Sequence, residues 1–92
     1  MAKHLRINGM VQGVGYRASF AARAQALKLS GWVRNRADGS VEASIRGESA
    51  AIVGMVDWAW HGPASAQVRD IVISEINDAL VLSGSFEILP TI

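Results

Sequence analysis

The stretch Trp32-Val-Arg-Asn-Arg-Ala-Asp-Gly-Ser-Val-Glu-Ala-Ser-Ile-Arg46 decides how this chain can fold. Its centre, Asp38-Gly39, accepts the positive φ angles of a tight turn and therefore predicts a β-hairpin. After the turn, Val41, Ala43 and Ile45 alternate with polar residues, which indicates a strand with one face toward water. Because a hairpin makes its two strands antiparallel, this segment excludes a purely parallel sheet.

Before the hairpin, a strand pattern gives way to a helix pattern. Residues 3–11 alternate along the chain, which predicts a half-buried strand. A glycine-rich loop follows, and apolar residues then recur at helical spacing from residue 17 to about residue 29. Ser30-Gly31 is the expected end of this helix. The apolar positions that carry the helical pattern are Tyr16, Phe20, Ala24 and Leu27.

After the hairpin, a second helix and a further strand are predicted. The helix has Ser49 as its expected N-cap and is expected to stop at Gly62-Pro63. Residues 67–76 form the next strand, in which the alternation slips between Val68 and Ile71 and so indicates a β-bulge. The remaining signals are a turn at Asn77-Asp78 and a short last strand at Phe86 and Ile88.

The predicted order of elements is β-α-β-β-α-β, with a short strand added at the end. Two β-α-β units joined by a hairpin imply an antiparallel sheet, and the right-handed crossover rule places both helices on one of its faces. We therefore expect a single domain over residues 1–92 with the ferredoxin-like α+β sandwich fold.

Composition and charge restrict the classes of protein to which the chain can belong. Half of the residues are hydrophobic and 18% are charged, as in a globular protein rather than a disordered one. The formal net charge of +1 argues against broad electrostatic capture of nucleic acid. No apolar run approaches the roughly 20 residues that cross a bilayer, and the chain has no cysteine. We expect a cytoplasmic monomer that binds neither nucleic acid nor membrane.

The loop Gly9-Met-Val-Gln-Gly-Val-Gly-Tyr-Arg17 is the strongest candidate for a functional site. Its glycines allow consecutive backbone N–H groups to converge, and the N-terminus of the following helix adds partial positive charge. Arg17 supplies a planar fork that matches two phosphate oxygens. The loop therefore predicts a phosphate-binding site, although an arginine at this place could equally be a surface residue paired with a carboxylate.

A dinucleotide-binding site is an alternative for this loop. Gly13-Val-Gly-Tyr-Arg-Ala18 fits the pattern Gly-x-Gly-x-x-Gly/Ala, and Asp38 follows about 20 residues later, as that motif requires. We reject this alternative because the hairpin at Asp38-Gly39 makes the next strand antiparallel, whereas the dinucleotide fold has a parallel sheet. The chain is also too short for a second nucleotide-binding half.

Other polar residues give weaker signals. Asn35, near the end of a strand, could be an ordinary turn residue, and Arg34 and Arg36 beside it could form a wet strand face. His4 and His61 are expected to be solvated, because no acid–base constellation surrounds either of them in the sequence. No cluster of His, Asp or Glu has the spacing of metal ligands, so we expect neither a metal nor a cofactor.

Two segments of the chain resemble the signatures of the acylphosphatase family. The first is Gly9-x-Val11-Gln12-Gly13-Val14-x-Tyr16-Arg17, and the second is Gly31-Trp32-Val33-Arg34-Asn35-x-x-x-Gly39-x-Val41, continued to Gly47. Gly62-Pro63, followed by Ala66 and Val68, also stands where the family has it. The family commonly has phenylalanine where this chain has Tyr16, and we expect little effect because either ring can anchor the helix in the core.

The resemblance implies an enzyme that hydrolyses the carboxyl–phosphate bond of acyl phosphates to a carboxylate and inorganic phosphate. It implies that Arg17 binds the phosphate and that Asn35 positions the attacking water. It further implies a small-molecule substrate held without metal by a cradle of backbone N–H groups, those of Gln12, Gly13, Val14, Gly15, Tyr16 and Arg17.

Non-enzymatic alternatives fit the same predicted fold. An RNA-recognition domain would need exposed aromatic side chains on its central strands, and residues 41–46 contain none. A regulatory or anion-binding module could keep the pocket without turnover, although the presence of both Arg17 and Asn35 favours catalysis. A domain of this kind can also form part of a larger carbamoyl-transfer protein, but Met1 and the length of 92 residues favour a free-standing enzyme.

Overall fold

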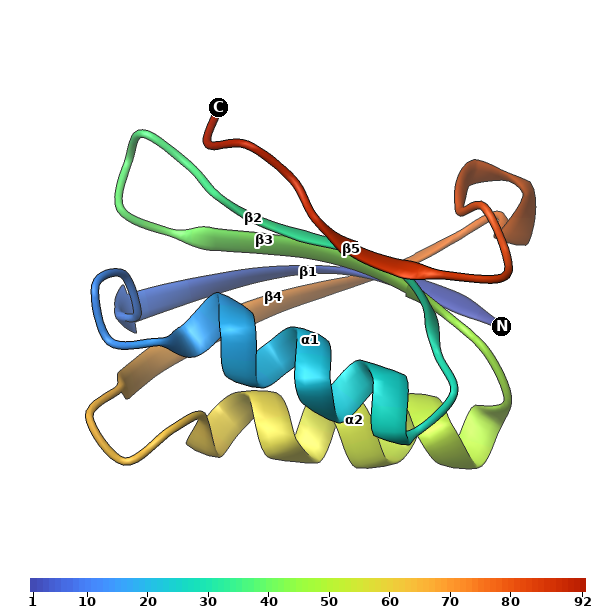
Figure 1. Ribbon diagram of the computed structural model, residues 1–92, viewed down its shortest axis with the longest axis horizontal. Helices are drawn as coiled ribbons and strands as arrows, with labels where there is room; N and C mark the ends of the chain where they lie inside the picture. The colour runs from blue at the N-terminus through green and yellow to red at the C-terminus, as the bar shows by residue number, and fades with distance from the viewer.

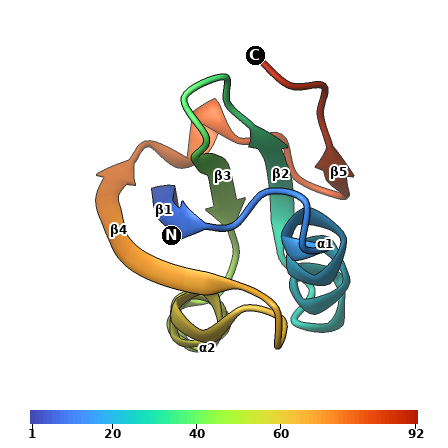
Figure 2. The ribbon, with the colours of Figure 1, turned by 90° about the vertical axis from the view of Figure 1, so that its left-hand side faces the viewer.

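The computed structural model describes all of residues 1–92, and its elements follow the predicted order of strands and helices (Figure 1). The elements are β1 (Ala2–Met10), α1 (Tyr16–Ala26), β2 (Ser30–Asn35), β3 (Val41–Arg46), α2 (Ser49–His61), β4 (Gln67–Ile76), the short 3-10 helix η1 (Asp78–Leu80) and β5 (Phe86–Ile88). Both helices pack on the same face of one sheet, which confirms the ferredoxin-like sandwich (Figure 2). Neither helix is long and apolar enough to cross a membrane.

The sheet has the strand order β4-β1-β3-β2-β5 and is mixed rather than wholly antiparallel. β1 pairs antiparallel with both β3 and β4, and β2 pairs antiparallel with β3, as the hairpin predicts. β5 instead runs parallel to β2, with Val33 opposite Ile88. β4 ends at the same end of the sheet at which β2 begins. Residues 77–85 cross this end to the opposite edge, so β5 starts there beside the start of β2 and runs in the same direction.

The C-terminal end of α1 differs from the sequence prediction. α1 ends at Ala26, and Lys28 then adopts the left-handed conformation with a φ of 59°. The N–H of Leu29 donates to the Ala24 carbonyl over 2.9 Å, as in a Schellman motif. Gly31 belongs to β2, where a Cβ would collide with the Ser44 carbonyl oxygen of β3. Glycine is therefore required there by close contact between strands and not by the end of a helix.

The start of α2 and the bulge in β4 are the remaining local predictions. Ser49 is the first residue of α2 rather than its N-cap, and Glu48 occupies the cap position without a side-chain hydrogen bond. Asn8 faces Asp70 and Gly9 faces Val68, which leaves one extra residue in β4 and confirms the bulge.

The hydrophobic core lies between the sheet and the two helices. α1 covers β2 and β5, whereas α2 covers β4 and β1 (Figure 2). Phe20 of α1 packs against Phe86 of β5 at a ring-centroid distance of 5.8 Å. This contact explains why the short last strand is held against α1, the helix that begins at the glycine-rich loop.

Tyr16 links the start of α1 to the last turn of α2. Its hydroxyl donates a hydrogen bond of 2.6 Å to the Ala59 carbonyl, and its side chain is buried. In a continuing helix this carbonyl would accept from the residue four positions later, but that residue is Pro63, which has no N–H. Burial raises the pKa of Tyr16, so the hydroxyl keeps its proton and remains a donor. The hydroxyl thus supplies the hydrogen bond that Pro63 cannot.

Replacing Tyr16 by phenylalanine is expected to lower the free energy of unfolding by about 1–3 kcal/mol, because the buried Ala59 carbonyl loses its partner. This differs from the small effect expected from the ring alone. Denaturant unfolding of the two proteins measures the difference. Equal stability would show that the hydroxyl contributes nothing and that the ring is the whole anchor.

Candidate active site

A cavity of about 220 Å³ lies where β2 ends and α1 begins. Half of its lining residues are apolar and half are polar or glycine. They are Val11, Gly13, Gly15, Tyr16, Arg17, Ala18, Asn35 and Ile88. The cavity therefore brings Arg17 of the first signature together with Asn35 of the second, although the two residues are far apart in the sequence.

The loop between β1 and α1 has the conformation that its glycines predict. Gly13 and Gly15 have φ angles of 73° and 79°, in the left-handed region. A Cβ at either position would meet no atom within 4 Å, so the backbone conformation and not crowding requires glycine there. No backbone N–H of residues 12–17 donates a hydrogen bond within the protein. The loop and the first turn of α1 thus keep a run of donors available for an anion.

Arg17 is the second residue of α1 and lines the cavity. It forms no ion pair with any carboxylate of the chain. The alternative in which this arginine is half of a surface ion pair is therefore wrong. A guanidinium at a helix N-terminus, beside free N–H donors, makes this end of the cavity attractive to a bound anion.

Asn35 is the last residue of β2 and stands opposite Val41 across the hairpin. Its backbone carbonyl accepts a hydrogen bond of 3.2 Å from the Ile92 N–H. Its side-chain Oδ1 is buried and accepts no hydrogen bond from the protein. A buried acceptor without a partner is uncommon in a folded protein and is typical of a position that serves a ligand or a water molecule.

The structure does not place every predicted site residue on the cavity wall. Gly13, Gly15, Tyr16, Arg17 and Asn35 line it, whereas Gln12 and Val14 are not among the lining residues. Three apolar lining residues are not predicted from the sequence as members of the site, namely Val11, Ala18 and Ile88. The strand pattern accounts for Val11 as a core residue, but no signal connects Ile88 to a loop more than 70 positions earlier.

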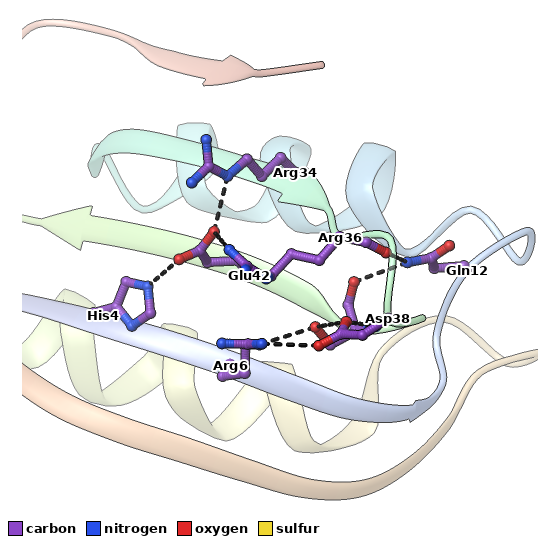
Figure 3. A network of polar contacts seen from close by, with 8 residues as sticks. His4, Arg6, Gln12, Arg34, Arg36, Asp38 and Glu42 are labelled. Atoms are coloured by element: carbon purple, nitrogen blue, oxygen red, sulfur yellow. Dashed lines mark hydrogen bonds and ion pairs between the residues drawn. The ribbon is translucent and has the colours of Figure 1, made fainter. Parts of the chain in front are cut away.

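The face of the sheet opposite the helices carries a cluster of charged residues centred on Glu42 (Figure 3). The Glu42 side chain is only 10% exposed. It accepts hydrogen bonds of 2.8 Å from Arg34 Nε and 3.1 Å from Arg36 Nη1, and its Oε2 lies 2.7 Å from His4 Nε2. The expectation of a wet face on β3 is therefore wrong for Glu42, and His4 is paired instead of solvated. Neighbouring strands supply partners that the period of one strand cannot reveal.

Burial alone would raise the pKa of Glu42, but hydrogen bonds from His4, Arg34 and Arg36 outweigh it and lower the pKa from 4.5 to about 2. The carboxylate is thus charged at neutral pH. Because Arg34 and Arg36 stand on either side of Asn35, this carboxylate anchors both neighbours of that residue.

Replacing Glu42 by glutamine is expected to lower the free energy of unfolding at pH 7 by about 2–3 kcal/mol. The folded-state pKa is below the unfolded one, so the contribution of the carboxylate is complete above pH 4.5 and is lost as the pH falls toward 2. The two proteins should therefore approach equal stability in acid. Denaturant unfolding at pH 7 and below pH 3 measures this, and a constant difference would contradict it.

Neither His61 nor a cluster of metal-ligating side chains indicates a second functional site. His61 Nδ1 lies 2.9 Å from the Asp57 carbonyl oxygen at the exposed end of α2. No group of three or more His, Cys, Asp or Glu side chains in residues 1–92 is arranged to hold a metal ion.

Comparisons with known proteins match both the sequence and the fold of this chain. The family model described as Acylphosphatase matches residues 3–88. An acylphosphatase from Azoarcus sp. (strain BH72) is 50% identical over 91 residues, which cover 98% of this chain and 90% of that protein. The structure of an acylphosphatase from Coxiella burnetii has a TM-score of 0.87 and 35% identity, over 96% of this chain and 90% of that chain. The crystal structure of acylphosphatase from Bacillus subtilis has a TM-score of 0.86 and 33% identity, over 97% and 99% of the two chains. Since the family match extends over most of its length, this chain belongs to the acylphosphatase family.

Proposed function

We propose that the cavity between α1 and the end of β2 is the site at which this chain hydrolyses acyl phosphates to a carboxylate and inorganic phosphate. The family and the fold support acyl phosphate hydrolase activity. The observation that supports this particular site is the meeting of an unpaired arginine, free loop N–H donors and an unpartnered Asn35 Oδ1 around one cavity.

Phosphate binding is the first step of the proposed reaction. The Arg17 guanidinium presents two parallel N–H donors to two phosphoryl oxygens, and the N–H groups of residues 12–17 surround the remaining oxygen. The partial positive charge at the N-terminus of α1 adds to this attraction. These donors are fixed before the substrate arrives, so they stabilise negative charge that develops in the transition state without having to reorganise.

Direct attack of water is the second step. Asn35 Oδ1 accepts a hydrogen bond from the water and holds it in line with the phosphorus and the bridging oxygen. The oxygen of the water forms the new bond to phosphorus while the bond between phosphorus and the bridging oxygen breaks. The electron pair of the broken bond leaves with the carboxylate. A phosphoryl oxygen takes a proton from the water. Since the transition state of phosphoryl transfer is loose, positioning and charge stabilisation carry most of the catalysis.

The leaving group explains how so few side chains can suffice. It is the conjugate base of a carboxylic acid with a pKa of roughly 4, so it departs as an anion at neutral pH without a general acid. The mechanism asks for no histidine, and His4 is in any case paired with Glu42 on the other face of the sheet. Arg17 and Asn35 are therefore the two side chains to which we assign catalytic roles.

Hydrolysis of an aromatic acyl phosphate, followed through the release of inorganic phosphate, tests the proposal. We expect turnover by the wild type and by Arg23→Ala, which removes an exposed arginine from the same helix outside the cavity. A wild-type protein that binds inorganic phosphate but releases none from any acyl phosphate would instead be a regulatory or anion-binding module. A monomeric, cytoplasmic protein acting on a small molecule remains our prediction for the chain as a whole.

A further inference from the structure

The side chain of Gln12 joins the glycine-rich loop to the hairpin that carries Asn35 (Figure 3). Its Nε2 donates a hydrogen bond of 2.8 Å to the Arg36 carbonyl and one of 2.9 Å to the Ser40 carbonyl. A primary amide has two N–H donors, so both are used and the side chain is held in one orientation. The contact is partly buried, which shields it from competition with water.

The two carbonyls stand at the base of the turn between β2 and β3. The N–H of Arg36 donates to the Ser40 carbonyl over 2.9 Å, which closes the turn. Arg36 directly follows Asn35 in the sequence, so Gln12 is bonded to the residue next to the one that holds the water in the proposed mechanism. At its other end, Gln12 precedes the glycines whose N–H groups surround the phosphate.

We propose that the Gln12 side chain is a positioning residue that fixes the separation between the phosphate loop and Asn35. The inference rests on the proposed function, in which the loop holds the phosphoryl group and Asn35 holds the water. The attacking oxygen must lie in line with the bond that breaks, and a misplacement of about 1 Å can cost about 100-fold in rate. A bridge between the two holders keeps this alignment, even though Gln12 is not a lining residue of the cavity.

The hairpin has separate anchors that keep it folded without Gln12. Arg6 of β1 donates to Ser40 Oγ over 3.0 Å and to Asp38 Oδ2 over 2.8 Å. Asp38 Oδ1 in turn accepts from the Ser40 N–H over 2.9 Å. These contacts fix the tip of the hairpin to β1 and involve no residue of the loop. Removing the Gln12 bridge should therefore change the separation between the loop and the hairpin more than it changes the conformation of the hairpin.

Gln12→Met removes both donors while keeping a side chain of similar length and adding no charge beside the phosphate. We expect kcat to fall by about 10- to 100-fold, with KM and the inhibition by inorganic phosphate changed less than about threefold. Arg6→Met is the matched control, because it removes hydrogen bonds from the same hairpin but leaves the loop alone. It should lower thermal stability and leave kcat unchanged. Equal kcat in Gln12→Met and the wild type would overturn the inference.

A double-mutant cycle separates positioning of Asn35 from a general structural effect. In an Asn35→Ala background, Gln12→Met should cost little further kcat, because there is no longer a water holder to align. Full additivity of the two losses would overturn the inference. If Gln12→Met does not fold, Gln12→Asn serves instead, since its amide is one methylene too short to bridge both carbonyls. A wild-type chain that does not hydrolyse acyl phosphates would overturn the proposed function and this inference together. An active wild type whose kcat is unchanged by Gln12→Met would overturn this inference alone.

Discussion

Replacing Arg17 by lysine is expected to lower kcat/KM for an aromatic acyl phosphate by about 100- to 1000-fold. Lysine keeps the positive charge but presents a single ammonium in place of the planar fork, so it cannot bind two phosphoryl oxygens in parallel. Arg17→Ala should lose at least as much. Because Arg17 has no partner within the protein, neither change should cost much stability.

Initial rates of phosphate release over a range of substrate concentrations measure this effect. Arg23→Lys is the matched control, since it makes the same chemical change on the exposed face of the same helix. Both variants should unfold at the same denaturant concentration as the wild type. Near-normal turnover by Arg17→Lys would show that charge alone is used, and the two-oxygen binding assigned to the guanidinium would then be wrong.

Local signals in the sequence predict most of the fold because each is satisfied by nearby residues. Asp38-Gly39 determines the hairpin, and the strand at Gln67–Ile76 has the predicted bounds with its bulge. The end of α1 is harder to predict, because a lysine takes the left-handed position that usually belongs to glycine. The parallel pairing of β5 also lies outside such signals, since it depends on where the chain crosses the end of the sheet.

The features of the site that could not be predicted from the sequence depend on contacts between segments that are distant in the chain. Glu42 reads as a wet residue on its own strand, yet partners from two neighbouring strands cover it. The Gln12 bridge likewise depends on carbonyls more than 20 positions away. Arg17 and Asn35 could be predicted because their motifs are recognisable, and the structure adds that one cavity joins them.

Replacing Asn35 by alanine is expected to lower kcat by about 100-fold or more, with only a small change in KM. In the proposed mechanism the amide holds the water, whose position matters in the transition state. Arg17 and the loop N–H groups, by contrast, are proposed to bind the substrate phosphate already in the ground state. Asn35→Asp keeps an oxygen that can accept from the water but places a negative charge beside the phosphoryl group. That variant should therefore raise KM as well as lower kcat.

Stability decides whether Asn35 serves the reaction or only the hairpin. Its Oδ1 is buried without a hydrogen bond from the protein, so removing the amide abolishes an unsatisfied acceptor and should leave the free energy of unfolding equal or higher. Asn77→Ala is the opposite case, because Asn77 Oδ1 accepts from the Ala79 N–H at the start of η1. It should cost about 1 kcal/mol of stability and no kcat. If Asn35→Ala is destabilised and has a changed KM but a normal kcat, Asn35 is a structural residue. If Asn35 holds the attacking water, the Asn35→Ala protein is stable and binds phosphate but hardly hydrolyses the substrate.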